Sequence, residues 1–308
     1  MGIFSKKKRT IKHADVSLSA TPTVAEIAAR AKELDLRTRK LSMQLFSGAT
    51  RSTAKGRGMS FKEVRQYQAG DDVRFIDWNV SARMGHTYSK VFEEEKELNV
   101  IVLVDVSKSN LFGTYVQSKK SQIVNLAAVL CFAAVNENNK AGMMFFSDKT
   151  EKWLPPKKSH QQVLYMVREL LAFDATATTT SIAQALDSLN ATLRQRSLVF
   201  IISDFISPGF LDALRVTAKR HDLVGVQVFD KSERRLPDMG LVEMEDWESG
   251  RTLLIDTSNP IERKLYQDQF DQRYLGLKEA FKSCGAELMQ VATDDDYIEK
   301  IKAFFLRR

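Results

Sequence analysis

An apolar run that ends in a carboxylate is the feature that most constrains how this chain can fold. Residues 98–104 read Leu-Asn-Val-Ile-Val-Leu-Val and are followed by Asp105, Ser107 and Ser109. A short run of β-branched residues and leucine, bounded by charge, predicts a buried strand in the centre of a parallel sheet. The Asp-x-Ser-x-Ser stretch then lies at the carboxyl end of that strand, where open α/β sheets place their ligand sites.

Beyond residue 98 the pattern alternates between apolar strands and amphipathic helices. Further strands are predicted at 141–147, 199–203, 223–229 and 286–291, with helices at 115–136, 161–171, 181–193, 211–219, 265–281 and 296–305. A short strand near Trp153 is expected to stop at Pro155, and residues 234–255 are expected to form a loop and a hairpin. The fold class predicted is α/β, a mostly parallel doubly wound sheet with an N-terminal helical and small β extension.

Two later stretches bring more oxygen atoms to the same predicted edge of the sheet. Thr180 ends the hydroxyl-rich loop 178–180 before a helix, and Asp204 follows the strand at 199–203. Carboxylates and hydroxyls are hard oxygen ligands of the kind that Mg²⁺ or Mn²⁺ binds. The expected metal ligands are Asp105, Ser107, Ser109, Thr180 and Asp204. The alternative is a cluster of helix-capping side chains without metal.

This set resembles the metal-ion-dependent adhesion site of von Willebrand factor type A domains, in which two serines and a threonine contact the metal and two aspartates bind it directly or through water. The resemblance covers roughly residues 98–308. The chain departs from it at Thr178 and Thr179, which stand where a pair of glycines is often found. Lys108 lies inside the serine motif, so its ammonium could compete with a metal for the aspartates.

The most distinctive segment, residues 65–83, interleaves three arginines with three aspartates. These are Arg65, Arg74 and Arg83 with Asp71, Asp72 and Asp77, and they suit bidentate ion pairs that would fix the segment as a clasp on the main domain. The segment, with His221-Asp222 and residues 105–113, resembles the bacterial family labelled domain of unknown function fifty-eight. That resemblance implies a partner, because members of the family often accompany MoxR-type AAA+ ATPases and are thought to act with them in protein assembly or maturation.

The charge distribution divides the chain into three predicted parts. Residues 1–21 form a basic flexible tail, 22–97 hold a helix at 22–46 and the family-signature segment, and 98–308 form the type A-like domain. Residues 1–97 carry 19 Lys/Arg and 12 Asp/Glu, against 27 of each in residues 98–308, so the excess of +7 lies in the first third. The tail could touch an anionic membrane surface, whereas the lack of interleaved aromatic residues argues against nucleic-acid binding.

The sequence also leads to expectations about the location of the protein and about catalysis. No apolar run is long enough to span a bilayer or form a signal-peptide core, so the protein is expected to be soluble and cytoplasmic. An Asp-nucleophile phosphotransferase would need a second carboxylate at position 107, which is serine, and no nucleophile, base and orienting group fall together. We therefore expect no enzyme but a protein-binding adapter whose metal holds an acidic residue of a partner. The alternative is a metal-dependent phosphoesterase or hydrolase.

Overall fold

The computed structural model describes residues 58–95, 97–107, 119–174, 177, 179–245 and 252–307. The expected basic tail and the expected helix at 22–46 lie outside these residues. The described chain falls into two compact units, one within residues 49–98 and one from residue 99 onward. The domain boundaries at 21, 22, 97 and 98 stay a prediction.

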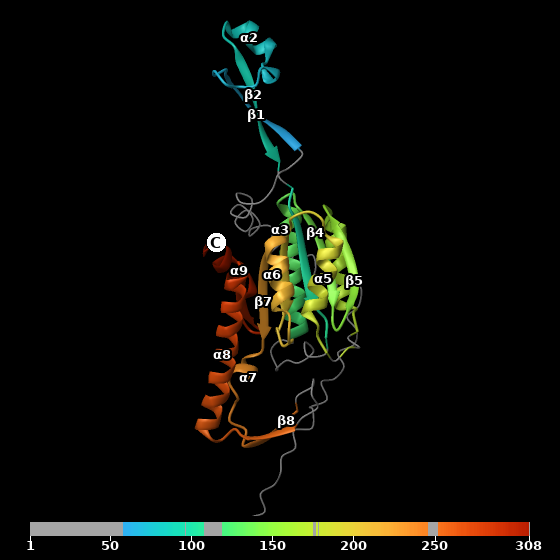
Figure 1. The fold of residues 1–308 in the computed structure, drawn as a ribbon, viewed down its shortest axis with the longest axis vertical. Coiled ribbons are helices and arrows are strands. Elements are labelled where there is room, and N and C mark those ends of the chain that lie inside the picture. The colour runs from blue at the N-terminus through green and yellow to red at the C-terminus, as the bar shows by residue number, and fades with distance from the viewer. Residues whose placement is uncertain are drawn as a thin grey trace, which may run out of the picture. The chain divides into compact units, whose positions relative to one another are not determined.

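The larger unit is an α/β domain around a six-stranded sheet in the order β10-β7-β6-β3-β4-β5 (Figure 1). Its strands are β3 (Asn99–Asp105), β4 (Lys140–Phe146), β5 (Thr150–Lys157), β6 (Leu198–Ser203), β7 (Asp222–Phe229) and β10 (Glu287–Ala292). Its helices are α3 (Lys119–Asn136), α4 (His160–Leu171), α5 (Ile182–Thr192), α6 (Leu211–Arg220), α7 (Lys231–Arg234), α8 (Pro260–Ser283) and α9 (Tyr297–Arg307). Every pair of neighbouring strands is parallel except β4 and β5, which confirms the predicted mostly parallel sheet.

Both faces of the sheet are buried, which explains why its central strands are apolar throughout. In β3, Val100, Val102 and Val104 pack in one cluster with side chains of α3, α4 and α9. Ile101 and Leu103 point the other way and pack with side chains of α5, α6 and α8. This is the alternation that period-two strands impose when helices cover both sides of a sheet.

One sequence prediction about local structure was wrong. β5 runs through Pro155 and Pro156 instead of stopping there, because it is the edge strand and its pairing with β4 shifts register next to them. In the smaller unit, residues 93–95 belong to a strand although all three are glutamates. The hairpin predicted within 234–255 is confirmed as β8 (Leu241–Glu245) and β9 (Thr252–Asp256).

The smaller unit pairs β1 (Gly58–Gln66) with β2 (Tyr88–Glu95) and carries a short helical segment, η2 (Val73–Phe75), and α2 (Trp78–Met84). Asp77 caps α2 by accepting hydrogen bonds from the backbone N–H groups of Asn79 and Val80. A carboxylate in this position stabilises a helix start, typically by about 1 kcal/mol.

The ion pairs of the smaller unit only partly match the predicted clasp. Arg65 pairs with Asp71 at 2.7 Å and Arg74 with Asp72 at 2.6 Å, as the alternation suggested. Asp77 pairs with Lys90 at 3.4 Å, and not with an arginine of the segment. The side chain of Arg74 is 82% exposed, so its pair with Asp72 is a surface pair that contributes little to stability. That the segment joins the two units stays a prediction.

Candidate functional site

Asp105 and Asp204 lie at the point where the connections of the sheet change direction. The chain leaves β3 toward β4 on one side, and later returns to place β6 on the other side of β3. Asp105 is the last residue of β3 and Asp204 directly follows β6. Such a switch point is where open α/β sheets bind ligands at the carboxyl ends of their strands.

The carboxylate of Asp105 is fixed by serine donors on both sides. Because Val104 of β3 pairs with Ile202 of β6, Ser203 falls next to Asp105, and its hydroxyl donates to Asp105 Oδ2 at 2.7 Å. The backbone N–H of Ser107 donates to Asp105 Oδ1 at 3.0 Å. Burial, followed by the nearby charge of Asp204, raises the pKa of Asp105 to about 6. The two carboxylates are therefore close enough to repel one another.

Asp204 is held in a different way. Its Oδ1 accepts from the backbone N–H of Ile206 at 3.1 Å, and its carbonyl oxygen accepts from the side-chain amide of Gln227 at 3.2 Å. Its Oδ2 is buried and has no hydrogen-bond partner among the described residues. The residue is 4% exposed, so its carboxylate is shielded from solvent.

Among the described residues, Asp204 forms an ion pair with Lys119, the first residue of α3. Its Nζ lies 3.7 Å from Asp204 Oδ2 and 2.5 Å from Glu233 Oε1, and the side chain is 2% exposed. Burial alone would lower the pKa of Lys119, but the charges of Glu233, Asp204 and Asp230 outweigh it, so that the pKa is raised. An ammonium competing for the aspartates was expected, but at Lys108, which lies outside the described residues.

Of the remaining predicted ligands, Thr180 can be placed and Ser109 cannot. Thr180 is buried, and its carbonyl oxygen accepts from the hydroxyl of Ser207, three residues after Asp204, at 2.9 Å. Its own Oγ1 is buried without a hydrogen-bond partner among the described residues. Ser109 lies outside the described residues.

Three residues near the site were not predicted as part of it: Ser203, Lys119 and Glu233. Ser203 could have been found, because it ends the strand next to β3 and directly precedes Asp204. Lys119 gave only the weak signal of a lysine at the start of an otherwise apolar helix. Glu233 lies in the four-residue helix α7 and gave none.

The oxygen atoms of this site are of the kind that a hard divalent cation binds, but only two of the side chains are carboxylates. Asp204 Oδ2 and Thr180 Oγ1 are buried oxygen atoms without hydrogen bonds, which a cation could satisfy. Within the described part of the chain, no three His, Cys, Asp or Glu side chains lie together in a way that could hold a metal. A cation here would therefore depend on hydroxyl ligands as well as on Asp105 and Asp204.

His221 lies at the opposite end of the sheet, directly before β7. Its ring is buried, and burial followed by the charges of Arg220 and Arg196 lowers its pKa to about 4. The imidazole is therefore neutral near pH 7 and belongs to a different region from the carboxylates.

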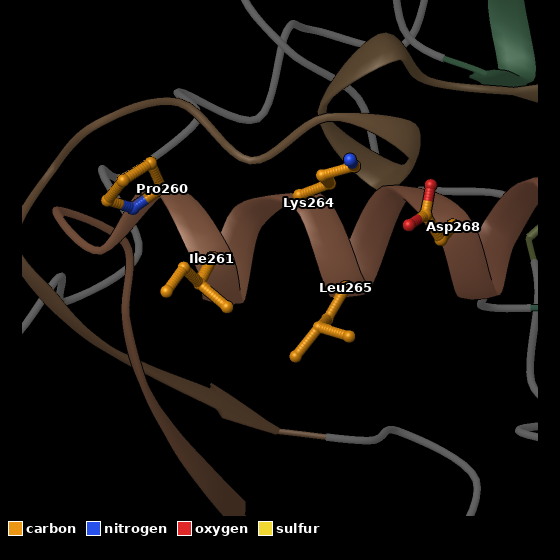
Figure 2. Close-up of a pocket in the computed structure, with 5 residues that line it drawn as sticks. All are labelled: Pro260, Ile261, Lys264, Leu265 and Asp268. Carbon is orange, nitrogen blue, oxygen red and sulfur yellow. The ribbon is translucent and has the colours of Figure 1, made fainter.

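A shallow hollow on the surface lies along the first turns of α8. It is lined by Pro260, Ile261, Lys264, Leu265 and Asp268, all from one helix (Figure 2). Ile261 and Leu265 are exposed, and none of the lining residues belongs to the carboxylate site. Within the described residues, no helix is both long and apolar enough to cross a membrane.

These features define an α/β protein whose mostly parallel sheet carries two buried carboxylates and a buried ammonium at its switch point. The family model described as "Protein of unknown function DUF58" matches residues 63–274, and the chain belongs to this family. The uncharacterized protein Rv1480 of Mycobacterium tuberculosis (strain ATCC 25618 / H37Rv) is 30% identical over 288 residues, which cover 92% of this chain and 90% of that protein. The uncharacterized protein YeaD of Bacillus subtilis (strain 168) is 27% identical over 107 residues, 35% of this chain and 25% of that protein.

Two solved structures resemble part of the chain. The conserved hypothetical protein BatB from Bacteroides thetaiotaomicron is 17% identical with a TM-score of 0.45, over 68% of this chain and 100% of that one. An aerotolerance-related membrane protein from Bacteroides fragilis is 15% identical with a TM-score of 0.46, over the same shares of the two chains. At these TM-scores the likenesses carry no argument about function.

Proposed function

We propose that this protein is a non-catalytic adapter that binds a partner protein through a divalent cation, Mg²⁺ or Mn²⁺, at the switch point of its sheet. Asp105, Ser107, Ser109, Thr180 and Asp204 would hold the cation. The observation that carries the proposal is the convergence of two buried carboxylates, together with two buried oxygen atoms, Asp204 Oδ2 and Thr180 Oγ1, that accept no hydrogen bond from the described residues.

The chemistry of these ligands favours an incoming carboxylate. Hydroxyl groups are neutral, so Ser107, Ser109 and Thr180 would leave part of the charge of a bound cation uncompensated. Lys119 next to Asp204 reduces the negative charge of the site further. An Asp or Glu side chain of a partner would supply the missing charge, and binding would then require the cation.

The resemblance of the chain to its family supports a MoxR-type AAA+ ATPase as the partner, with a role in protein assembly or maturation. The basic N-terminal tail supports a peripheral contact with an anionic membrane surface as an additional property. A cytoplasmic location is part of the same proposal.

Binding of the purified full chain to a purified MoxR-type ATPase from the same genome tests the proposal. We expect binding in Mg²⁺ that is lost in EDTA and in Asp204→Asn and Thr180→Val, which preserve side-chain size. Thr192→Val, at an exposed threonine of α5, serves as the matched control. Binding that survives EDTA and Thr180→Val would contradict the metal bridge.

The same samples test the rival hydrolase function. A metal-dependent phosphoesterase would turn over a simple aryl phosphate, and this turnover would disappear in Asp105→Asn and Asp204→Asn. The adapter predicts no turnover above that of the variants. Turnover that depends on both aspartates would replace the adapter proposal with the hydrolase.

A further inference from the structure

Lys119 is a buried cation shared between two carboxylates. Its Nζ is 2.5 Å from Glu233 Oε1 and 3.7 Å from Asp204 Oδ2. The side chain lies at the start of α3, a helix in which fifteen of eighteen residues are buried. A charge is placed in such surroundings only when carboxylates compensate it.

Glu233 is itself held in place, and so determines where the ammonium lies. Its Oε2 accepts from the backbone N–H of Asp230 at 3.3 Å, while its Oε1 contacts Lys119. Asp230 completes the capping box at the start of α7, and its Oδ2 accepts from the hydroxyl of Thr293 at 2.9 Å. One turn after Lys119, the side-chain amide of Gln122 donates to the carbonyl oxygens of Ala292 and Asp295. The position of the ammonium is therefore fixed from outside the carboxylate site.

The ammonium and a divalent cation would compete for one atom, Asp204 Oδ2. Asp105 is already engaged by two serine donors, so Asp204 has the carboxylate oxygen that is not hydrogen-bonded. A cation bound there would lie close to Lys119 in surroundings that screen charge poorly, and the two would repel one another.

We infer that Lys119 sets the cation affinity of this site, and that Glu233 tunes it by drawing the ammonium away from Asp204. This inference rests on the proposed metal site and adds a residue that determines how tightly the site binds. In wild type, the ammonium lowers affinity for the free cation, so that loading depends on the carboxylate of the partner. Removing Lys119 raises affinity, whereas removing the charge of Glu233 leaves the ammonium to Asp204 alone and lowers it.

The test is a titration of the purified full chain with Mn²⁺ alone, followed by electron paramagnetic resonance of the free ion. We expect Lys119→Met to bind Mn²⁺ at least about tenfold more tightly than wild type, and Glu233→Gln to bind it several-fold more weakly. Lys120→Met is the matched control, because the neighbouring ammonium donates to the carbonyl oxygen of Phe173 and not to the site.

The double variant Lys119→Met with Glu233→Gln controls for misfolding of the single variants, because it removes both charges of the pair and leaves neither of them buried alone. It should bind more tightly than wild type, and Glu233→Gln should have little effect in the Lys119→Met background. Equal affinities of wild type, Lys119→Met and the double variant would overturn the inference while leaving the metal site standing. No Mn²⁺ binding by any folded variant would overturn both.

Discussion

The buried carboxyl of Asp105 makes the stability of the larger unit depend on pH, and Asp105→Asn isolates this effect. Burial and the charge of Asp204 raise the pKa of Asp105 from 3.8 to about 6. The folded protein therefore holds this proton more tightly than the unfolded chain does. The contribution of Asp105 to stability is fully present below the unfolded pKa and is lost as the pH rises through about 6.

The size of the loss follows from the difference between the two pKa values. At about 1.4 kcal/mol per pH unit, ionisation of Asp105 removes at most about 3 kcal/mol of unfolding free energy by neutral pH. Asparagine has the same shape and stays neutral, and its Oδ1 can still accept from the N–H of Ser107. The altered contact with the Ser203 hydroxyl costs about 1 kcal/mol. Asp105→Asn should thus be more stable than wild type by up to about 2 kcal/mol near pH 7 and no more stable near pH 4.

Urea unfolding in EDTA, followed by circular dichroism between about pH 4 and pH 7, measures this difference. EDTA keeps any divalent cation from lowering the pKa of Asp105. Asp187→Asn, at an exposed position of α5, is the control and should show no such pH-dependent gain. A stability difference between Asp105→Asn and wild type that does not change with pH would refute the reasoning, as would a variant less stable than wild type near pH 7.

Two further predictions concern packing and capping. A Cβ at Gly225 of β7 would lie 2.6 Å from the ring of Phe281, whereas one at Gly276 of α8 would meet nothing within 4 Å. Gly225→Ala should therefore lower the unfolding free energy by about 1 to 3 kcal/mol. Gly276→Ala should raise it by up to about 1 kcal/mol. Equal midpoints of urea unfolding for the two variants would contradict this packing. Asp77→Ala removes the N-cap of α2 and should lower the stability of the smaller unit by about 0.5 to 2 kcal/mol, which increases its amide hydrogen exchange. Unchanged exchange in the smaller unit, or an equal increase in the larger unit, would contradict a local cap.

The mostly parallel sheet and the proximity of Asp105 to Asp204 could be predicted from the sequence. Both depend on a local rule, because an apolar run that ends in a carboxylate places that carboxylate at the carboxyl edge of a parallel sheet. The position of Pro155 inside β5 could not be predicted in this way. Its tolerance depends on β5 being an edge strand with a register shift, which is decided by tertiary pairing.

The burial of the charged side chains at this site also could not be predicted from the sequence. The end of a predicted strand gives the position of Asp204 but not its exposure, and the residue is buried and paired with Lys119. Lys119 and Glu233 come from the start of α3 and from a four-residue helix after β7, and neither stretch carries a local pattern that points to the other. Only tertiary packing brings the two side chains into contact.

The buried ammonium has a consequence for how the site relates to the fold. A cage of carboxylates alone would repel itself and would need a bound cation to remain folded. Here Lys119 supplies a permanent positive charge beside Asp204, and the serine donors around Asp105 satisfy the second carboxylate. The larger unit can therefore keep its two aspartates buried whether or not a divalent cation is bound. In the proposed function, cation binding would then depend on the carboxylate of the partner, and the fold of the larger unit would not require the cation.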